Sequence, residues 1–215
     1  MKNMISKLVT IATDPATIRE LLRFRFVGYL KETGWVESIR QQQPVDEEGK
    51  PLPWMTLPFI HFLDSRLTSS MTIFEFGSGN STKYFRRKVD SVRSVEHDPA
   101  WYARLQKEGI QDIVEFQPLD DTDRYEKKAA ESGKQYNIIV VDGRRRVRCI
   151  INSISALCSD GVIVLDDSER EEYAEGVLFL RQHGFKRLDF WGIAPGMHDK
   201  KCTSVFYRTE NCLGI

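Results

Sequence analysis

Acidic side chains beside a glycine-rich turn give this sequence its clearest chemical signal. Gly77 and Gly79 follow the apolar run 72–76 directly, and this spacing allows a tight turn whose backbone can approach a ligand closely. Glu75 precedes the first glycine. Glu96 follows a second predicted strand, residues 91–95, at the interval of about 20 residues where an acid typically accepts hydrogen bonds from ribose hydroxyls. The turn and its two acids therefore predict a binding site for a nucleoside.

The turn itself suits a polar or anionic group. A helix is predicted directly after it, because Asn80 or Ser81 can cap the first helical turn. The free N–H groups and positive dipole end of that helix would face any group above the end of the preceding strand. A tight turn that binds nothing is the alternative interpretation of the glycines alone. The neighbouring acids favour the binding site.

Acidic residues also follow the other predicted strands. The apolar runs 136–141 and 162–165 are continuous, which is typical of strands buried on both faces of a parallel sheet. The carboxyl ends of parallel strands meet at one edge, and ligands bind beyond that edge. The acids expected there are Glu75, Glu96, Asp120, Asp142, Asp166 and Asp167. Their gathering on one rim indicates a functional site.

Strands alternate with helices through most of the chain, which predicts an α/β sheet with helices on both faces. The expected strands are residues 72–76, 91–95, 112–116, 136–141 and 162–165. Residues 185–191 and 203–207 are expected to form a closing hairpin. We assign residues 69–215 to this domain and residues 1–68 to an N-terminal helical extension, or cap.

The extension is predicted to begin with an amphipathic helix. Pro15 takes the first helical position, and Gly34 stops the helix. Its apolar face consists of Ile18, Leu22, Phe26 and Leu30. We expect this face to pack while Arg19, Arg23 and Arg25 remain solvated; a membrane or partner surface is the alternative.

A polar connector, residues 41–53, follows that helix. Thr56 can then cap a second helix at 57–67. Trp54 and His61 lie near the expected entrance of the site, and packing is favoured over substrate contact for both.

The glycine turn resembles the first motif of the class I S-adenosylmethionine-dependent methyltransferases, in which an acid precedes Gly-x-Gly. The resemblance covers residues 70–208 in the order of elements. It implies a Rossmann-like, doubly wound sheet of seven mostly parallel strands with an antiparallel last strand. Ser81 replaces the third glycine of the family. Thr82 stands where the dinucleotide pattern has glycine, which counts against NAD more than against S-adenosylmethionine.

The resemblance also assigns roles in binding S-adenosylmethionine. Glu96 would hold the ribose hydroxyls, and Asp120 the adenine amino group, with Asp121 as the alternative to Asp120. These roles suit carboxylates, because both kinds of ligand group are hydrogen-bond donors. The residues expected to hold the methionine portion are Glu75, Gly77, Ser78, Gly79, Asn80 and Ser81.

The predicted reaction is methyl transfer to a small molecule, with O-methylation favoured. The cofactor supplies the leaving group, so the protein aligns the acceptor and removes its proton, with Asp142 as the candidate base. Arg144 and Arg145 begin an arginine cluster that continues to Arg148 and suggests an anionic substrate. A solvated helix face paired with acids is the alternative for this cluster. An NAD-dependent oxidoreductase and a non-catalytic cofactor-binding module are the alternative functions.

Asp142, Asp166 and Asp167 also resemble the metal ligands of metal-dependent O-methyltransferases, in which an acid after the fourth strand joins an Asp-Asn pair after the fifth. Clustered carboxylates repel one another unless a cation or protons compensate them. Oxygen ligands suit Mg²⁺, which is therefore a candidate cofactor. Three carboxylates carry more charge than one divalent ion neutralises, so compensation by the arginines is the alternative.

Charge and cysteine content limit the expected partners. Lys plus Arg and Asp plus Glu are both 31 among 215 residues, and this zero net charge predicts a small-molecule substrate and no nucleic acid. The chain lacks the run of about 18 apolar residues that integral membrane association requires. The four cysteines show no CxxC spacing and are expected to be free thiols in a cytoplasmic protein. The sequence leaves the oligomeric state open.

Overall fold

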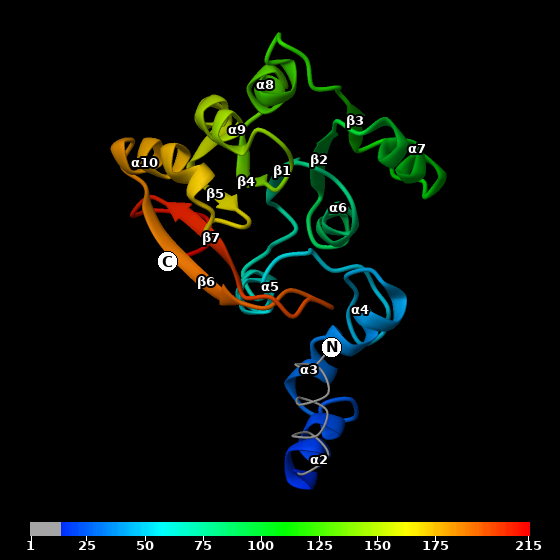
Figure 1. Cartoon of the computed structure of the whole chain (residues 1–215). Coiled ribbons are helices and arrows are strands. Elements are labelled where there is room, and N and C mark those ends of the chain that lie inside the picture. The colour runs from blue at the N-terminus through cyan, green and yellow to red at the C-terminus, as the bar shows by residue number, and fades with distance from the viewer. Residues whose placement is uncertain (1–13) are drawn as a thin grey trace.

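The computed structural model describes residues 14–215 and shows a sheet with helices on both faces (Figure 1). Its seven strands are arranged in the order β3-β2-β1-β4-β5-β7-β6. They are β1 (Thr72–Phe76), β2 (Ser91–Glu96), β3 (Val114–Phe116), β4 (Tyr136–Val141), β5 (Leu157–Leu165), β6 (Lys186–Gly192) and β7 (Lys201–Tyr207). Pairing is parallel from β3 to β5, whereas β7 is antiparallel to β5 and to β6. The predicted fold class is confirmed, including the antiparallel last strand.

One helix precedes β1, and further helices connect the successive strands from β1 to β6 as expected. They are α5 (Leu57–Asp64), α6 (Asn80–Arg86), α7 (Pro99–Lys107), α8 (Arg124–Glu131), α9 (Arg146–Ser153) and α10 (Ala174–Gln182), with short 3-10 turns η1 (Ile154–Ala156) and η2 (Glu171–Tyr173). Helix α9 ends at Ser153, and the chain then passes through η1 into β5, which begins at Leu157 and so before the expected strand 162–165. The glycine turn lies between β1 and α6, at the carboxyl end of a central strand.

The two faces of the sheet carry separate apolar cores. Successive residues of a strand point to opposite faces, so Ile139 packs under α8, α9 and α10, whereas Ile138 and Val140 pack under α5 and α6. In Figure 1, α8, α9 and α10 accordingly lie to one side of the strands and α5 to the other. The continuous apolar sequences of β4 and β5 follow from burial on both faces.

The start of the extension differs from the prediction. The expected single helix is divided into α2 (Pro15–Arg23), α3 (Tyr29–Glu32) and α4 (Trp35–Gln41). Gly28 and Gly34 separate them with φ values of 85° and 75°. A Cβ at Gly34 would lie 2.3 Å from the carbonyl oxygen of Val45, so the chain needs glycine at that break. The predicted packing of the apolar face is also wrong, because none of the residues of α2 is buried.

The second half of the extension is attached to the sheet through the β6–β7 hairpin. The indole nitrogen of Trp35 donates to the carbonyl oxygen of Met197 at 2.7 Å. The backbone nitrogen of Leu57 donates to the carbonyl oxygen of Ile193 at 2.9 Å. The hydroxyl of Thr56 donates to the carbonyl oxygen of Phe190 and does not cap α5, contrary to expectation. These contacts fix the segment between α4 and α5 beside the carboxyl edge of the sheet.

Candidate functional site

The glycine turn is held by backbone contact with the turn that follows β4. Gly77 has φ 95°, and a Cβ there would lie 3.2 Å from the carbonyl carbon and oxygen of Asp142. A Cβ at Gly143 would lie 2.9 Å from the nitrogen of Gly77 and 2.1 Å from the hydroxyl oxygen of Tyr125. The nitrogen of Asp142 donates to the carbonyl oxygen of Phe76 at 3.0 Å. Both turns therefore need glycine to approach each other.

Glu75 lies beneath the turn and positions it. Its side chain is 1% exposed, and its Oε2 accepts hydrogen bonds from the hydroxyls of Thr82 at 2.5 Å and Ser94 at 3.0 Å. The nitrogen of Gly79 donates to the same Thr82 hydroxyl at 3.0 Å. Burial raises the pKa of Glu75 to about 7, although hydroxyl donors including Ser81 oppose the shift. Thr82 and Ser94 are positioning residues that the motif alone did not reveal.

Glu96, at the end of β2, is held in a fixed orientation beside the turn. It is 4% exposed, and its Oε1 accepts from the backbone nitrogens of His97 and Asp98, both at 2.8 Å. Its Oε2 accepts from the hydroxyl of Ser78 at 2.6 Å. The backbone donors orient the carboxylate, while the Ser78 hydroxyl can rotate to leave Oε2 for another donor. This geometry fits the predicted contact with ribose hydroxyls.

A cavity of about 270 Å³ opens between the turn and the extension. The turn contributes Ser78, Gly79, Asn80 and Ser81; the extension contributes Gln42, Gln43, Pro44 and Trp54; Trp101 and Asp142 also line the cavity. The side-chain amide of Asn80 donates to the carbonyl oxygen of Pro44 at 2.8 Å and links the two walls. The indole nitrogen of Trp101 donates to the carbonyl oxygen of Ser78 at 2.9 Å. The structure therefore brings four of the predicted turn residues and Asp142 into one cavity, whereas Glu75, Gly77 and Glu96 do not line it.

Asp120 does not line that cavity. One oxygen of its carboxylate accepts from the backbone nitrogen of Thr122 at 2.9 Å and from the hydroxyl of the same residue, which closes a local turn. Its carbonyl oxygen accepts from the guanidinium of Arg145 at 2.7 Å. Its role towards adenine remains a prediction, as does the competing role of Asp121.

The three carboxylates proposed as metal ligands are compensated by protein cations. The ammonium of Lys201 contacts Asp166 and lies 2.6 Å from Oδ1 of Asp167. The guanidinium of Arg146 lies 2.9 Å from Oδ1 of Asp142 and 3.6 Å from Oδ2 of Asp167. Among residues 14–215, no group of three or more His, Cys, Asp and Glu side chains is arranged to hold a metal ion. The expected Mg²⁺ site is therefore not supported, because an ammonium and a guanidinium occupy the positions between the carboxylates.

Asp142 keeps a partly open position within this network. Its side chain is 24% exposed and borders the cavity, whereas Asp166 is fully buried and accepts from the hydroxyl of Thr203 at 2.6 Å. Burial raises the pKa of Asp142 to about 8, and the charge of Asp166 adds to the shift against the opposing charges of Arg146 and Lys201. A carboxylate with this pKa can accept a proton from a neighbouring group near neutral pH.

Some side chains of the arginine cluster are paired with carboxylates of the chain, and one is exposed to solvent. Arg145 donates to Oε1 of the buried Glu126 at 2.9 Å, and Arg148 lies 2.7 Å from Oδ1 of Asp123. Arg146 belongs to the carboxylate network described above. Arg144 is exposed, and together with the other three it borders a cavity of about 590 Å³ beyond β4 and β5. Of the two predicted substrate contacts, Arg144 presents the more accessible guanidinium.

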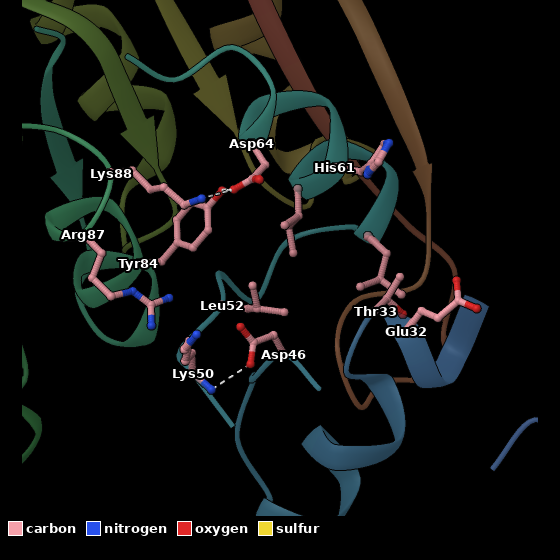
Figure 2. Close-up of a pocket in the computed structure, with 12 residues that line it drawn as sticks. Glu32, Thr33, Asp46, Lys50, Leu52, His61, Asp64, Tyr84, Arg87 and Lys88 are labelled. Atoms are coloured by element: carbon pink, nitrogen blue, oxygen red, sulfur yellow. Dashed lines mark hydrogen bonds and ion pairs between the residues drawn. The ribbon is translucent and has the colours of Figure 1, made fainter. Parts of the chain in front are cut away.

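A third cavity, of about 570 Å³, lies between the extension, α5 and α6 (Figure 2). The hydroxyl of Tyr84 and the ammonium of Lys88 both contact Oδ1 of Asp64 at 2.7 Å. His61 borders this cavity, whereas Trp54 borders the cavity at the glycine turn. The two residues expected near one entrance therefore belong to different cavities.

Comparisons with known proteins give a clear result only at the level of structure. No family model matches the chain, and no curated protein matches it in sequence. A precorrin-6y C5,15-methyltransferase from Geobacter metallireducens has 16% sequence identity and a TM-score of 0.52 over 71% of this chain and 87% of its own. An rRNA methylase from Streptococcus thermophilus has 15% identity and a TM-score of 0.52 over 71% and 97% of the respective chains. This chain has the class I methyltransferase fold.

The same comparison corrects one expectation about partners. The fibrillarin pre-rRNA processing protein of Methanococcus jannaschii has 17% identity and a TM-score of 0.50, over 68% of this chain and 69% of its own. The fibrillarin protein and the rRNA methylase both share the fold of this chain, and the names of both refer to RNA. The expectation that zero net charge excludes nucleic acid is therefore wrong. Within residues 14–215, no helix has the length and apolarity needed to cross a bilayer.

The buried Glu75 predicts a specific pH dependence of stability. Its folded-state pKa of about 7 exceeds its ordinary value of 4.5, so the folded state binds the proton more tightly. The stabilisation is complete below pH 4.5 and is lost as the pH rises through about 7. Relative to Glu75→Gln, the wild-type free energy of unfolding should fall by about 2 to 3 kcal/mol between pH 5 and pH 8.

Urea unfolding of both proteins at the two pH values measures this difference. The exposed Glu115 of β3 provides the control, since Glu115→Gln should follow the wild type at both pH values. An equal pH dependence in wild type and Glu75→Gln would show that Glu75 does not titrate in this range.

Proposed function

We propose that this chain transfers the methyl group of S-adenosylmethionine to an acceptor hydroxyl. The single observation that carries the proposal is the cavity that the glycine turn and Asp142 line together at the carboxyl edge of the sheet. Glu96 accepts a hydrogen bond from Ser78, one of the residues that line this cavity. The class I methyltransferase fold supports it, since ligands of such sheets bind beyond this edge. When bound, the cofactor supplies an electrophilic methyl group on a sulfonium leaving group.

The residues around the cavity fit this cofactor. Glu96 offers a carboxylate oriented by backbone donors, which suits two ribose hydroxyls. The backbone at Gly79 and Asn80 opens into the cavity without a covering side chain from the glycine, which suits the methionine portion. A third fingerprint glycine for NAD is absent, and Thr82 at that position is committed to Glu75 and Gly79. These features favour S-adenosylmethionine over NAD.

Asp142 is the proposed general base. It borders the cavity, its pKa is raised to about 8, and Arg146 holds one of its oxygens. A hydroxyl acceptor needs a base more than an amine does, because a neutral amine is a stronger nucleophile than a neutral hydroxyl, which gains nucleophilicity when its proton is removed. The arrangement therefore favours O-methylation. A non-catalytic binding module would not need a partly open, proton-accepting carboxylate beside the cofactor turn.

An anionic group on the acceptor is proposed to contact Arg144. Arg144 is exposed, lines the cavity of about 590 Å³ together with Gly143, and offers bidentate donors to a carboxylate or phosphate. Such oxygens occur in metabolites and in nucleic acids. Hydroxylated aromatic acids, sugar phosphates and RNA are accordingly the acceptor panels to be screened.

The cofactor assignment predicts that Glu96→Ala weakens binding of S-adenosylhomocysteine by about 1.5 to 3 kcal/mol, the value of hydrogen bonds to a charged group. Calorimetric titration measures the affinity, and the same titration with NADH should show no binding. Glu96→Gln keeps the shape of the side chain and controls for local unfolding; Glu115→Ala controls for a lost acid elsewhere. Unchanged affinity in a folded Glu96→Ala protein would remove Glu96 from the site.

The assignment of Asp142 predicts a pH-dependent rate. Turnover should rise with pH through about 8 as the carboxylate loses its proton. Asp142→Asn should lower kcat by about 10²- to 10⁴-fold, abolish this rise, and leave S-adenosylhomocysteine affinity within about twofold. Methyl transfer to the best acceptor from the panels, followed from pH 6 to 9, tests the point. A mutant that keeps the wild-type profile would exclude Asp142 as the base.

The contact with Arg144 predicts discrimination by charge. Arg144→Gln should reduce kcat/KM for an anionic acceptor by about tenfold, the effect of one charged hydrogen bond, and should not affect its neutral ester. Arg148→Gln is the matched control, because Arg148 already pairs with Asp123. Equal values of kcat/KM for the acid and the ester in the wild type would contradict the anionic acceptor.

A further inference from the structure

An exposed apolar surface lies near the start of the described residues, at the N-terminal end of the extension. We define the α2 surface as Leu21 and Leu22 of α2 with Phe24, Phe26, Val27 and Tyr29, which follow it. Leu22 is 59% exposed and Phe26 68%, although such side chains normally avoid water. In Figure 1, α2 projects away from the sheet, on the far side of α4. Within residues 14–215, the α2 surface is therefore not covered by the core.

Basic side chains accompany the α2 surface. Arg19 and Arg23 lie on α2 to one side of its apolar residues, and the guanidinium of Arg25 lies 5.8 Å from the ring centre of Phe26. Glu20 is the only acid of α2, and it lies 3.6 Å from Arg23 with both side chains exposed. The ion pair therefore neutralises only part of the positive charge.

The charge of the whole chain is divided unevenly. Residues 1–29 hold five Lys and Arg against two Asp and Glu, a charge of +3. Because the complete chain is neutral, the remaining residues carry −3. An acidic surface would thus attract the segment that contains α2, which favours an orientation with α2 towards that surface.

We propose that the α2 surface binds peripherally to a bilayer that contains anionic phospholipid. A short amphipathic helix with arginines beside Leu and Phe can lie in the interface, with its apolar side among the acyl chains and its guanidinium groups at the phosphates. No helix of the described residues crosses a membrane, which is consistent with peripheral contact. The proposal is independent of the methyl transfer proposed above.

A second copy of this chain is the rival occupant. Symmetric pairing of two α2 surfaces would bring two sets of arginines together, with one acid on each helix to offset them. An anionic bilayer removes this repulsion and satisfies the same apolar residues. The charge therefore favours the bilayer.

Co-sedimentation of the full chain with lipid vesicles tests the proposal. Vesicles of phosphatidylcholine with phosphatidylserine should bind the protein, whereas phosphatidylcholine alone should bind it at least about tenfold more weakly. High salt should weaken binding, because the screening length falls from about 10 Å at 0.1 M to about 3 Å at 1 M.

Two variants separate the contribution of the apolar side chains to vesicle binding from that of the basic side chains. Leu22→Ser with Phe26→Ser should weaken binding by more than about tenfold through lost burial. Arg19→Gln, Arg23→Gln and Arg25→Gln together should weaken it on the order of 100-fold, since each basic residue contributes about fivefold. Leu178→Ser on α10 and Arg40→Gln on α4 are the matched exposed controls and should leave binding unchanged. Circular dichroism melting verifies that each variant is folded.

Three results would overturn the proposal: absence of binding to the phosphatidylserine vesicles, equal binding to both kinds of vesicle, and binding that survives both sets of substitutions. Sedimentation velocity without lipid provides a fourth. A dimer that dissociates in the Leu22→Ser, Phe26→Ser protein would assign the α2 surface to a second copy of the chain.

Discussion

The arrangement of acids at the carboxyl edge of the sheet depends on the ammonium of Lys201, which lies between the carboxylates of Asp166 and Asp167. Both ends of the contact are largely buried, and Arg146 adds a second cation on the side of Asp142. Loss of one partner from a buried pair costs about 3 to 5 kcal/mol, because an uncompensated charge stays in a poorly solvated site. Without Lys201, Asp166 and Asp167 at the end of β5 would lie side by side without the ammonium that now contacts both.

The same ammonium links the sheet to the extension. It donates to the carbonyl oxygen of Trp54 at 3.3 Å, and the neighbouring hydroxyl of Thr203 accepts from the nitrogen of Thr56 at 3.1 Å. Trp54 borders the cavity at the glycine turn, so the wall supplied by the extension is attached to the network that surrounds Asp142. One antiparallel strand, β7, thus contributes both to the position of the cavity wall and, through Lys201, to the charges around Asp142, the proposed base.

The parts of the site that depend on neighbours in sequence could be predicted. Gly77, Gly79 and Glu75 lie within one strand-to-helix turn, and the rim follows from the rule that parallel strands end at the same edge. Lys201 could not be found in this way, because it lies 35 residues from Asp166 and is brought there only by the antiparallel pairing of β7 with β5. The Mg²⁺ expectation failed for this reason: the carboxylates were recognised, but the cation between them was not.

Net charge was the least informative of the sequence properties, because electrostatic recognition acts over a short distance. Screening at physiological salt limits it to about 8 Å, far less than the separation between the ends of a domain of this size. The neutral total combines a basic first segment with an acidic remainder, and the arginines from Arg144 to Arg148 add a further local concentration of positive charge. The binding of a polyanion would depend on the charge of these local surfaces and not on the net charge of the whole chain. The exclusion of nucleic acid failed because it relied on the total charge and not on the local charge. The ion pairs of Arg145, Arg146 and Arg148 show which of the local positive charges are already paired with carboxylates of the chain.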